Sequence, residues 1–503
     1  MNRRDFLQLA VKGIGMVSLT SIGLPLGIPF IRTSSGLELK ERGIEVNDIH
    51  TGLNPTVVEK ILYPSSLNAL KEAILMAGNE EKSICTAGAR HAMGGQQFVT
   101  GGILIDTTTL SRVIAFDPES GTIEVEAGIQ WPQVIAYLLN KQKGLSNQWG
   151  IIQKQTADWL SIGGCIGSNI HGRGLNMKPF VQDVEAFTLI DAHGKEWRCS
   201  REENKELFKL AIGGYGLLGI IYSVKLRLAP RKKLECVVSI ADIENLVHLY
   251  KKRIKEGFLY GSFLYNASPE SEGFLRKGIL VCYRPVDTSA TVPDYPKQPS
   301  QESWIKLRLL AHTDKERYFE QLKAIYMSRS GKLYWSDTHQ LGLYIKGYHR
   351  QLDNLLGSLP GSDIPTEVYV PEENLTEFID ELRKDFIKNK VNLIFGEIGL
   401  IQKDDESFLS YAKRPWVRIS LHIHTVHTPE GIKHSRHVLQ QLIDRVIGYN
   451  GSYYLTNHRF ATTTQLIKCY PQFPEFLRLK KKYDPEERFQ SNWYRYYKEG
   501  IEI

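Results

Sequence analysis

The chain has 503 residues, of which 42% are hydrophobic and 24% are charged, and its net charge at pH 7 is +7. This length and this balance exclude an intrinsically disordered chain and predict two or three packed domains. The positive charge is spread along the chain, and no basic segment is interleaved with aromatic residues, so nucleic-acid binding is not expected.

The N-terminal segment has the features of an export signal. Adjacent Arg3 and Arg4 precede the apolar, glycine-rich run GIGMVSLTSIGLPLGIPF, a pattern typical of a twin-arginine signal. The alternative is an amphipathic helix of the mature fold. We therefore expect residues 1–45 to direct the chain through the twin-arginine export machinery to the periplasm or cell envelope. Whether they stay as an anchor is open, because no small-x-small cleavage site follows Phe30.

The cysteines argue against a zinc site. They are widely spaced, and the sequence has no CxxC motif and no cysteine paired with histidine at metal-ligand spacing. An even number in an exported chain permits disulfides, but several lie in apolar or glycine-rich runs, where buried thiols are common. We expect reduced, mostly buried thiols and no metal at Cys85, Cys165, Cys199, Cys236, Cys282 and Cys469.

The first part of the chain is predicted to form short β/α units. Residues 67–78 have helical apolar spacing, and residues 131–141 do so again. Residues 183–197 read as a hairpin turned at His193-Gly194. Strands are predicted at residues 82–88, 101–110 and 122–129.

The second part has longer elements and fewer glycines, so we place a domain boundary near Pro230. Strands and helices alternate in the pattern of a sheet covered by helices on one side, which leaves its other face open. The proline-rich residues 286–303 are predicted to be a loop. The strands are expected at residues 278–284, 366–371, 392–401 and 416–426, and the helices at residues 373–388 and 434–449.

Two glycine-rich loops are the main candidates for chemistry, TAGARHAMGGQQF at residues 86–98 and SIGGCIGSNIHGRG at residues 161–174. Such loops expose backbone N–H groups and let a ligand approach without Cβ clashes, which suits a pyrophosphate. Neither follows the GxGxxG or GxxxxGK[ST] spacing, so a Rossmann or P-loop nucleotide site is disfavoured. The alternative is a pair of ordinary turns in a glycine-rich surface.

These loops, with ELFKLAIGGYGLLGIIYSVKLRL and the terminal YDPEERFQSNWY, resemble flavin oxidoreductases of the vanillyl-alcohol oxidase family. The resemblance covers nearly all of the chain after the leader. It implies an α+β fold with a two-lobed, PCMH-type FAD-binding domain at residues 46–232. It also implies a substrate-binding cap domain at residues 233–450, with an antiparallel sheet covered by helices, and a C-terminal segment at residues 451–503 that returns to the FAD-binding domain.

The resemblance implies FAD as the cofactor and His91 as its covalent attachment point on the 8-methyl carbon of the isoalloxazine. The alternative is that His91 only hydrogen-bonds the cofactor or nearby backbone. His171 is also open to two readings, as a cofactor contact or as a structural histidine. The expected cofactor-binding residues are Gly88, Ala89, Arg90, His91, Ala92 and Gln96 in the first loop, Gly163, Gly164, Gly167, Ser168, His171 and Gly172 in the second, and Ile221 near the adenine.

Substrate chemistry is expected from the second part of the chain, where WVRISLHIHT alternates with a period of two. One reading is that the polar face of this strand covers the flavin and binds a hydroxylated substrate, and another is that it is solvated. A metal site at His422, His424 and His427 is disfavoured, because no carboxylate stands nearby at matching spacing. The apolar face holds Val417, Ile419, Leu421 and Ile423, and the polar face holds Arg418, Ser420, His422 and His424.

The preceding strand resembles the alditol and gulonolactone oxidases, in which a glutamate at the position of Glu397 contacts the substrate and a histidine near His422 lies in the same pocket. A carboxylate there can orient or deprotonate a hydroxyl while hydride leaves its carbon. Those oxidases carry an arginine two residues after the glutamate, where this chain has Gly399.

They also carry a lysine in a late His-Trp-x-Lys motif, where this chain has Asn457, His458 and Arg459. Arg418 or Arg459 is a candidate for the missing positive charge. The candidate catalytic residues are therefore Glu397, His422, Arg418 and His458.

The function that follows is an exported FAD-dependent oxidoreductase acting on a CH–OH group of a polyol, a sugar or an aldonolactone-like small molecule. Oxygen or a membrane electron acceptor would reoxidise the flavin. One alternative is amine oxidation as in cytokinin dehydrogenases, whose base is an aspartate before the second glycine loop; Asp158 lies close but in a different register. The others are oxidation of a prenyl-phosphoryl sugar, suggested by YLTNHR, and a non-catalytic envelope protein that binds a carbohydrate or a partner.

Overall fold

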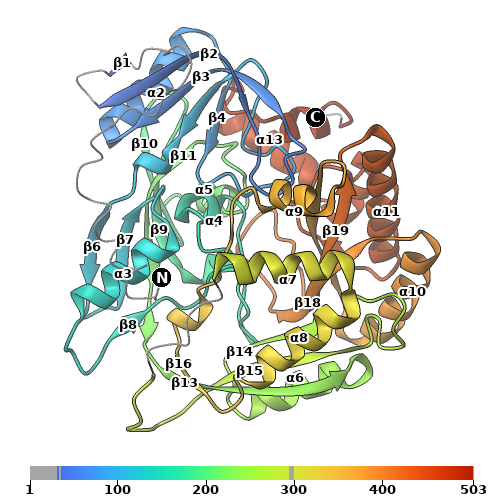
Figure 1. The fold of residues 1–503 in the computed structure, drawn as a ribbon. Helices are drawn as coiled ribbons and strands as arrows, with labels where there is room; N and C mark the ends of the chain where they lie inside the picture. Colours follow the sequence, from blue (N-terminus) through green and yellow to red (C-terminus); the bar gives the residue numbers. More distant parts are fainter. Residues whose placement is uncertain (1–30, 33–35, 294–299, 502–503) are drawn as a thin grey trace.

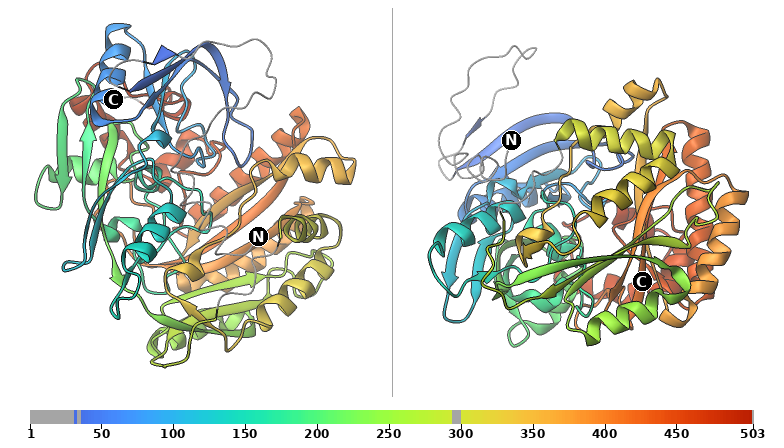
Figure 2. Two further views of the ribbon diagram at one scale, coloured as in Figure 1. Left: turned by 60° about the vertical axis from the view of Figure 1, so that its left-hand side comes forward. Right: turned by 60° about the horizontal axis from the view of Figure 1, so that its bottom comes forward.

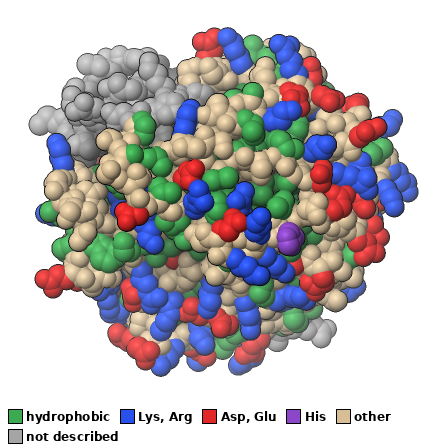
Figure 3. Space-filling view, turned by 90° about the horizontal axis from the view of Figure 1, so that it is seen from below, with side chains coloured by type: hydrophobic (Ala, Val, Ile, Leu, Met, Phe, Trp, Pro, Cys, Tyr) green, Lys and Arg blue, Asp and Glu red, His purple; other side chains and the backbone are tan. Residues whose placement is uncertain are grey.

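The computed structural model describes residues 31–32, 36–293 and 300–501, which form an α+β fold (Figure 1). Of the predicted export segment at residues 1–45, residues 1–30, which hold Arg3, Arg4 and the apolar run, and residues 33–35 lie outside these ranges. Within them, no helix combines the length and the apolar character needed to span a membrane. Figure 3 shows basic and acidic side chains interspersed over the face seen from below, in keeping with the spread of charge along the sequence.

The first glycine loop begins at the end of a strand of the first sheet. Helix α2 (Leu67–Asn79) begins at Ser66, whose side chain accepts a hydrogen bond from the Ala69 N–H, and it packs an apolar stripe against the sheet. The loop at residues 88–98 follows the carboxyl end of β4. The strand order is β1 (Ile31–Arg32), β2 (Leu37–Val46), β3 (Thr56–Pro64), β5 (Ile103–Asp106) and β4 (Ile84–Ala87), with β3, β5 and β4 parallel.

The second sheet is antiparallel and carries the second glycine loop. That loop enters α4 (Ile162–Gly167), which packs beside β11, while α3 (Trp131–Lys141) and α5 (Lys205–Ala211) lie nearby in the chain. β9 and β10 form the predicted hairpin. The strand order is β10 (Glu196–Ser200), β9 (Val184–Ile190), β11 (Ile220–Arg227), β7 (Thr122–Glu126) and β6 (Val113–Asp117), and β8 (Trp149–Gly150) pairs separately with β12 (Ala229–Pro230).

The third sheet has eight strands, all paired antiparallel, and begins at Lys233 (Figure 2). Its strands β18 and β19 bear three of the four candidate catalytic residues, Glu397, Arg418 and His422. The strand order is β16 (Leu333–Trp335), β13 (Lys233–Asp242), β15 (Lys277–Pro285), β14 (Tyr260–Tyr265), β18 (Leu393–Ile401), β19 (Trp416–Val426), β17 (Gly361–Val370) and β20 (Ser452–Tyr453).

Helices lie on both faces of this sheet (Figures 1 and 2). α6 (Ile243–Lys255), α10 (Leu375–Lys388) and α11 (Pro429–Gly448) pack on one face. The expectation of an open second face is wrong, because α7 (Gln301–Thr313), α8 (Lys315–Met327) and α9 (Tyr348–Leu356) lie across it. Sequence reasoning missed α7 and α8 because few of their residues are buried and charged residues interrupt their apolar spacing.

The end of the chain returns to the first sheet. The Ile84 N–H donates to the Arg488 carbonyl over 2.6 Å, and the Gln490 N–H donates to the Ile84 carbonyl over 2.8 Å. The last helices are α12 (Thr463–Cys469), α13 (Phe473–Tyr483), which ends before Asp484-Pro485, and α14 (Asn492–Lys498).

All six cysteines are buried and free, as the sequence predicted. Burial raises the pKa of the Cys85 and Cys165 thiols to about 12. Because the thiolate is the reactive form, these side chains are inert core residues at neutral pH.

Candidate active site

A cavity of about 1250 Å³ lies between the two glycine loops and the third sheet. Its walls come from the first two sheets on one side and from β17, β18 and β19 on the other, with α7 and α8 contributing further residues. Ligand pockets usually measure about 300–1000 Å³. The cavity therefore has room for a dinucleotide and a second, smaller molecule.

The first glycine loop lines the cavity at the six residues that the sequence analysis names as candidates for cofactor binding, Gly88, Ala89, Arg90, His91, Ala92 and Gln96. A Cβ on Gly88 would lie 2.0 Å from the Ser161 Oγ atom, so glycine is what lets the two loops approach each other. Arg90 adopts the left-handed φ of 62°, and its guanidinium donates to Asp106 over 2.8 Å.

The second loop lines the cavity at Gly163, Gly164, Gly167 and Ser168, and Ile221 lines it too. A Cβ on Gly167 would meet no atom within 4 Å, so its backbone faces open space. Gly172 does not line the cavity, which corrects the expectation that it contacts the cofactor. His171 does not line it either, and its position agrees with the second of its two interpretations, a structural histidine. A Cβ on Gly172 would lie 2.9 Å from the Gln153 side chain, and His171 is turned into the protein interior.

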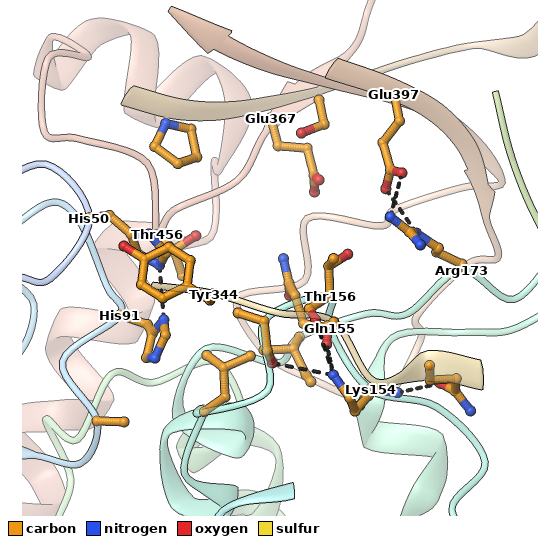
Figure 4. A pocket seen from close by; sticks show the side chains of 18 of the residues that line it. His50, His91, Lys154, Gln155, Thr156, Arg173, Tyr344, Glu367, Glu397 and Thr456 are labelled. Carbon is orange, nitrogen blue, oxygen red and sulfur yellow. Dashed lines mark hydrogen bonds and ion pairs between the residues drawn. The ribbon is translucent and has the colours of Figure 1, made fainter. Parts of the chain in front are cut away.

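His91 is held at both ring nitrogens, and Figure 4 shows its contact with His50. Its Nε2 atom lies 3.2 Å from the Trp159 carbonyl oxygen, and its Nδ1 atom lies 2.9 Å from His50 Nε2. Because a carbonyl only accepts, the proton is on His91 Nε2, and Nδ1 accepts from His50. Burial, reinforced by the neighbouring His50, holds the pKa of His91 well below its usual value. The imidazole is thus neutral, with its lone pair on Nδ1.

The polar face of β19 points into the cavity. Arg418, Ser420 and His422 line it, whereas the intervening residues are buried on the opposite face, so the predicted alternation is confirmed. In the β18–β19 register, Phe395 is opposite His422 and Glu397 is opposite Ser420. This face is therefore the wall of an internal site and is not a solvated surface.

Glu397 is clamped by two arginines from different parts of the chain, and Figure 4 shows the contact with one of them, Arg173. Arg173 Nη2 lies 2.9 Å from its Oε2 atom, Arg418 Nη2 lies 3.0 Å from its Oε1 atom, and Ser262 donates to Oε2 over 2.6 Å. Burial alone would raise the pKa of Glu397, but Arg173, Arg418 and Ser262 together hold it well below its usual range. The carboxylate therefore stays ionised and oriented.

A second carboxylate, Glu367 on β17, shares Arg418. Arg418 Nη1 lies 3.3 Å from Glu367 Oε2, while His171 Nε2 and the Tyr369 hydroxyl each lie 2.6 Å from Oε1. Burial opposes ionisation, yet His171 and Arg418 lower the pKa of Glu367 to about 2. A continuous polar network thus runs from His171 through Glu367 and Arg418 to Glu397.

Sequence reasoning missed Glu367 and Arg173. Arg173 lies within the HGRG motif, and Glu367 is a lone carboxylate in the strand sequence TEVYVP. A charged residue inside an otherwise apolar predicted strand was the available signal, since such a residue is buried only with a partner.

The two candidate histidines have different positions. His422 lines the cavity and stacks on Phe395 with ring centroids 3.8 Å apart. Burial, together with the charge of Arg308, lowers the pKa of His422 to about 3, so its ring is neutral. His458 does not line the cavity and packs against Phe460, which corrects its assignment as a catalytic residue. The adjacent Asn457 faces the cavity instead.

Asp158, the residue that an amine-oxidising reading requires, is engaged elsewhere. Its Oδ1 atom lies 2.9 Å from Lys154 Nζ and accepts the Gly342 N–H over 2.9 Å, and both charged side chains are buried. Asp158 is absent from the described residues that line the cavity, although Lys154 is among them.

The β19 histidines do not share a metal-binding point. His422 stacks on an aromatic ring, His424 Nδ1 lies 3.1 Å from Asp363, and the His427 ring lies 2.8 Å from the Ser362 hydroxyl. Among the described residues, His312, Asp363 and His424 do form a group with metal-ligand-type atoms within 4.8 Å of one another. Asp363 also accepts the Tyr348 hydroxyl over 3.1 Å.

Comparison with known proteins agrees with this geometry. Residues 58–200 match the FAD binding domain family. The chain is 30% identical to L-gulonolactone oxidase of Bos taurus over 177 residues, 35% of this chain and 39% of that protein. It is 29% identical to D-arabinono-1,4-lactone oxidase of Yarrowia lipolytica over 189 residues, 37% of this chain and 34% of that protein.

Cytokinin dehydrogenase 2 of Arabidopsis thaliana is also similar, with 27% identity over 179 residues, 34% of each chain. The matched region thus spans less than two fifths of each of these three relatives. Residues 58–200, which contain both glycine loops, therefore form an FAD binding domain, and the chain resembles the aldonolactone oxidases that share it.

Proposed function

We propose that the protein is an FAD-dependent oxidoreductase that oxidises a CH–OH group of a sugar-like substrate, an aldonolactone or a polyol. The observation that carries this proposal is the cavity itself, which joins both glycine loops to a polar wall bearing the clamped Glu397 carboxylate. The names of the lactone-oxidising relatives support the same substrate class.

The residues present fit FAD. The cavity exceeds the size of an ordinary ligand pocket, the two loops touch at Gly88, and the backbone at Gly167 opens onto free space that a side chain would fill. We assign the two five-stranded sheets to the two lobes of an FAD-binding domain at residues 46–232, with a cap domain at residues 233–450. FAD, when bound, supplies the two-electron acceptor for hydride.

His91 is the proposed point of covalent attachment. A nucleophilic nitrogen needs an unprotonated lone pair, and the Trp159 carbonyl and His50 together place that lone pair on Nδ1. The lowered pKa of His91 keeps this form at neutral pH. FAD that stays with acid-precipitated protein would support the bond.

Glu397 and His422 are the proposed substrate-binding groups. Both are in the form that accepts a hydrogen bond, Glu397 as a carboxylate and His422 as a neutral imidazole. A substrate hydroxyl can donate to either, and its proton leaves through the acceptor as hydride leaves the carbon. Arg418 and Arg173 fix the Glu397 carboxylate so that it does not rotate when the hydroxyl binds.

Two alternatives have less support. Amine oxidation requires a free carboxylate before the second glycine loop, but Asp158 is paired with buried Lys154. A purely carbohydrate-binding role does not explain an ionised carboxylate clamped by two arginines within the same cavity as an FAD binding domain.

The twin-arginine pattern of the N-terminal sequence supports a proposal on the location of the protein. We propose export by the twin-arginine route to the periplasm or cell envelope, with reoxidation by oxygen or a membrane electron acceptor. Cell fractionation of the full chain and of a variant with both Arg3→Lys and Arg4→Lys tests this, since only the parent chain should leave the cytoplasm.

The activity is tested by anaerobic bleaching of the flavin absorbance. The substrates are L-gulono-1,4-lactone, D-arabinono-1,4-lactone, D-glucitol and a secondary amine. We expect reduction by a hydroxylated compound, and we expect Glu397→Gln to keep its flavin but slow reduction about 100-fold or more. Glu373→Gln is the control, because Glu373 is an exposed partner of Arg414. Reduction by the amine alone, or at the parent rate in Glu397→Gln, contradicts the proposal.

A further inference from the structure

Arg308 on α7 is a cavity-lining guanidinium without a counterion. Its Nη1 atom is buried and has no hydrogen-bond partner among the described residues, and no carboxylate there lies within ion-pair distance. Three other arginines that line the cavity each have a carboxylate counterion. Arg90 lies 2.8 Å from Asp106, and Arg173 and Arg418 lie 2.9 Å and 3.0 Å from Glu397.

Aromatic rings hold the Arg308 side chain in place. Its Cζ atom lies 4.0 Å from the Phe395 ring centroid, 4.6 Å from that of Trp304 and 6.0 Å from that of Tyr348. Trp304 is one turn before Arg308 on the same helix face. Such cation–π contacts stabilise the charge, but they do not satisfy the in-plane N–H donors of the guanidinium.

The acidic side chains that line the cavity are already engaged. Glu397 holds Arg173 and Arg418, Glu367 holds His171 and Arg418, and Asp363 holds His424 and the Tyr348 hydroxyl. None of these three is therefore available to Arg308. A partly buried charge without a counterion is costly, and an anionic ligand removes that cost.

Arg308 also lies next to the proposed reaction site. The Phe395 ring that it covers stacks on His422, and Phe395 stands two residues before Glu397 on the same face of β18. Two residues along a strand span about 7 Å. A charged group bound at Arg308 would thus belong to the same small molecule as a carbinol held at Glu397.

We propose that Arg308 binds an anionic oxygen group of the substrate, a carboxylate or a phosphate. The inference rests on the proposed function and narrows its substrate class to hydroxy acids or sugar phosphates. Arginine suits this task because its planar guanidinium offers paired N–H donors to two oxygens of one anion. The cations Arg317, Arg329 and Lys332, which also line the cavity, favour the entry of an anion.

The test compares three ligands with one carbon skeleton, D-glucitol, D-gluconate and D-glucitol 6-phosphate, by titration calorimetry on the purified flavoprotein. We expect at least one of the two anions to bind about tenfold or more tightly than D-glucitol. The stronger of the two identifies the group as carboxylate or phosphate. Arg308→Gln should abolish the preference and leave the flavin content unchanged, whereas Arg308→Lys should retain part of the preference.

Arg414→Gln is the matched control, because Arg414 is an exposed arginine that pairs with Glu373 and does not line the cavity. Equal binding of all three ligands, no binding of either anion, or an equal loss for all three in Arg308→Gln would each overturn the proposal. Purified protein that lacks flavin would contradict the proposed function. The preference for an anionic ligand could still be measured in that protein, because calorimetry does not require turnover.

Discussion

Arg418 lies directly across the β18–β19 pair from Gly399, with its Nη2 atom 2.7 Å from the position that a Cβ on residue 399 would take. From there the guanidinium reaches Glu397, two residues earlier on β18. In the oxidases that the sequence resembles, an arginine two residues after the glutamate stands on the same strand. Here the neighbouring strand supplies the charge, and glycine leaves room for it.

Gly399→Ala is predicted to disrupt this arrangement. The new Cβ would push the Arg418 guanidinium away from Glu397, because the contact at 2.7 Å is too short for carbon and nitrogen. We expect the flavin content to stay constant and the anaerobic rate of flavin reduction to fall about tenfold.

The double variant Gly399→Arg with Arg418→Ala moves the charge to the other strand and should recover part of that rate. A Gly399→Ala protein that reduces its flavin at the parent rate would show that the position of Arg418 does not matter.

Glu367→Gln is predicted to destabilise the fold. The substitution leaves His171 and Arg418 facing a neutral amide in a buried network, and breaking a buried charge pair costs about 3–5 kcal/mol. Urea unfolding measures the change, and Glu373→Gln at the surface should alter the free energy of unfolding by no more than about 0.5 kcal/mol. A decrease in the free energy of unfolding for Glu367→Gln as small as that of the control would contradict a stabilising role for this network.

Stability should fall as the pH is lowered from about 6.5 toward 5. Burial lowers the pKa of His50, His349 and His458 to about 4 and that of His422 to about 3, so these rings stay neutral in the fold. The unfolded chain binds protons below its pKa of about 6.5, so each ring lowers the free energy of unfolding by up to about 1.4 kcal/mol per pH unit in this window.

Urea unfolding at a series of pH values between about 7.5 and 5 measures this slope. His458→Asn should reduce it by about 1.4 kcal/mol per pH unit whatever its effect on absolute stability. Glu367 and Glu397, whose pKa values are lowered, lose their contribution only below about pH 4.5. Burial raises the pKa of Asp183 to about 8, so this carboxyl opposes the histidine slope, but it does so equally in both proteins and cancels in the comparison. An unchanged slope in His458→Asn would show that this ring is not neutral in the fold.

His91→Ala should separate binding of FAD from its attachment. The loop backbone and the second glycine loop remain, so we expect the variant to bind FAD that acid precipitation releases into the supernatant. The absorbance at about 450 nm in pellet and supernatant measures the two fractions. Flavin that stays in the His91→Ala pellet would place the bond elsewhere.

Local sequence pattern was enough to predict much of this site. The period-two alternation of β19 correctly separated Arg418, Ser420 and His422 from the buried face, because side-chain direction in a strand depends only on residue parity. The two glycine loops were found for a similar reason, since close backbone approach requires glycine wherever it occurs.

What the sequence did not reveal depends on contacts between distant segments. Arg173 and Glu397 are 224 residues apart and meet only through the packing of the third sheet against the second glycine loop. Gly172 and His458 were misplaced, and His171 was left undecided, because a motif gives a residue's neighbours in the chain but not which way the residue faces. Arg308 lies on a helix whose charged residues obscured its apolar spacing.

The most direct test of the account is the anaerobic absorbance spectrum of the purified protein before and after addition of a hydroxylated substrate. We predict one bound FAD per chain, bleached by an aldonolactone, an aldonate or a sugar phosphate, and equally bound but bleached about 100-fold or more slowly in Glu397→Gln. A colourless protein that also fails to take up added FAD would contradict the assignment of this cavity.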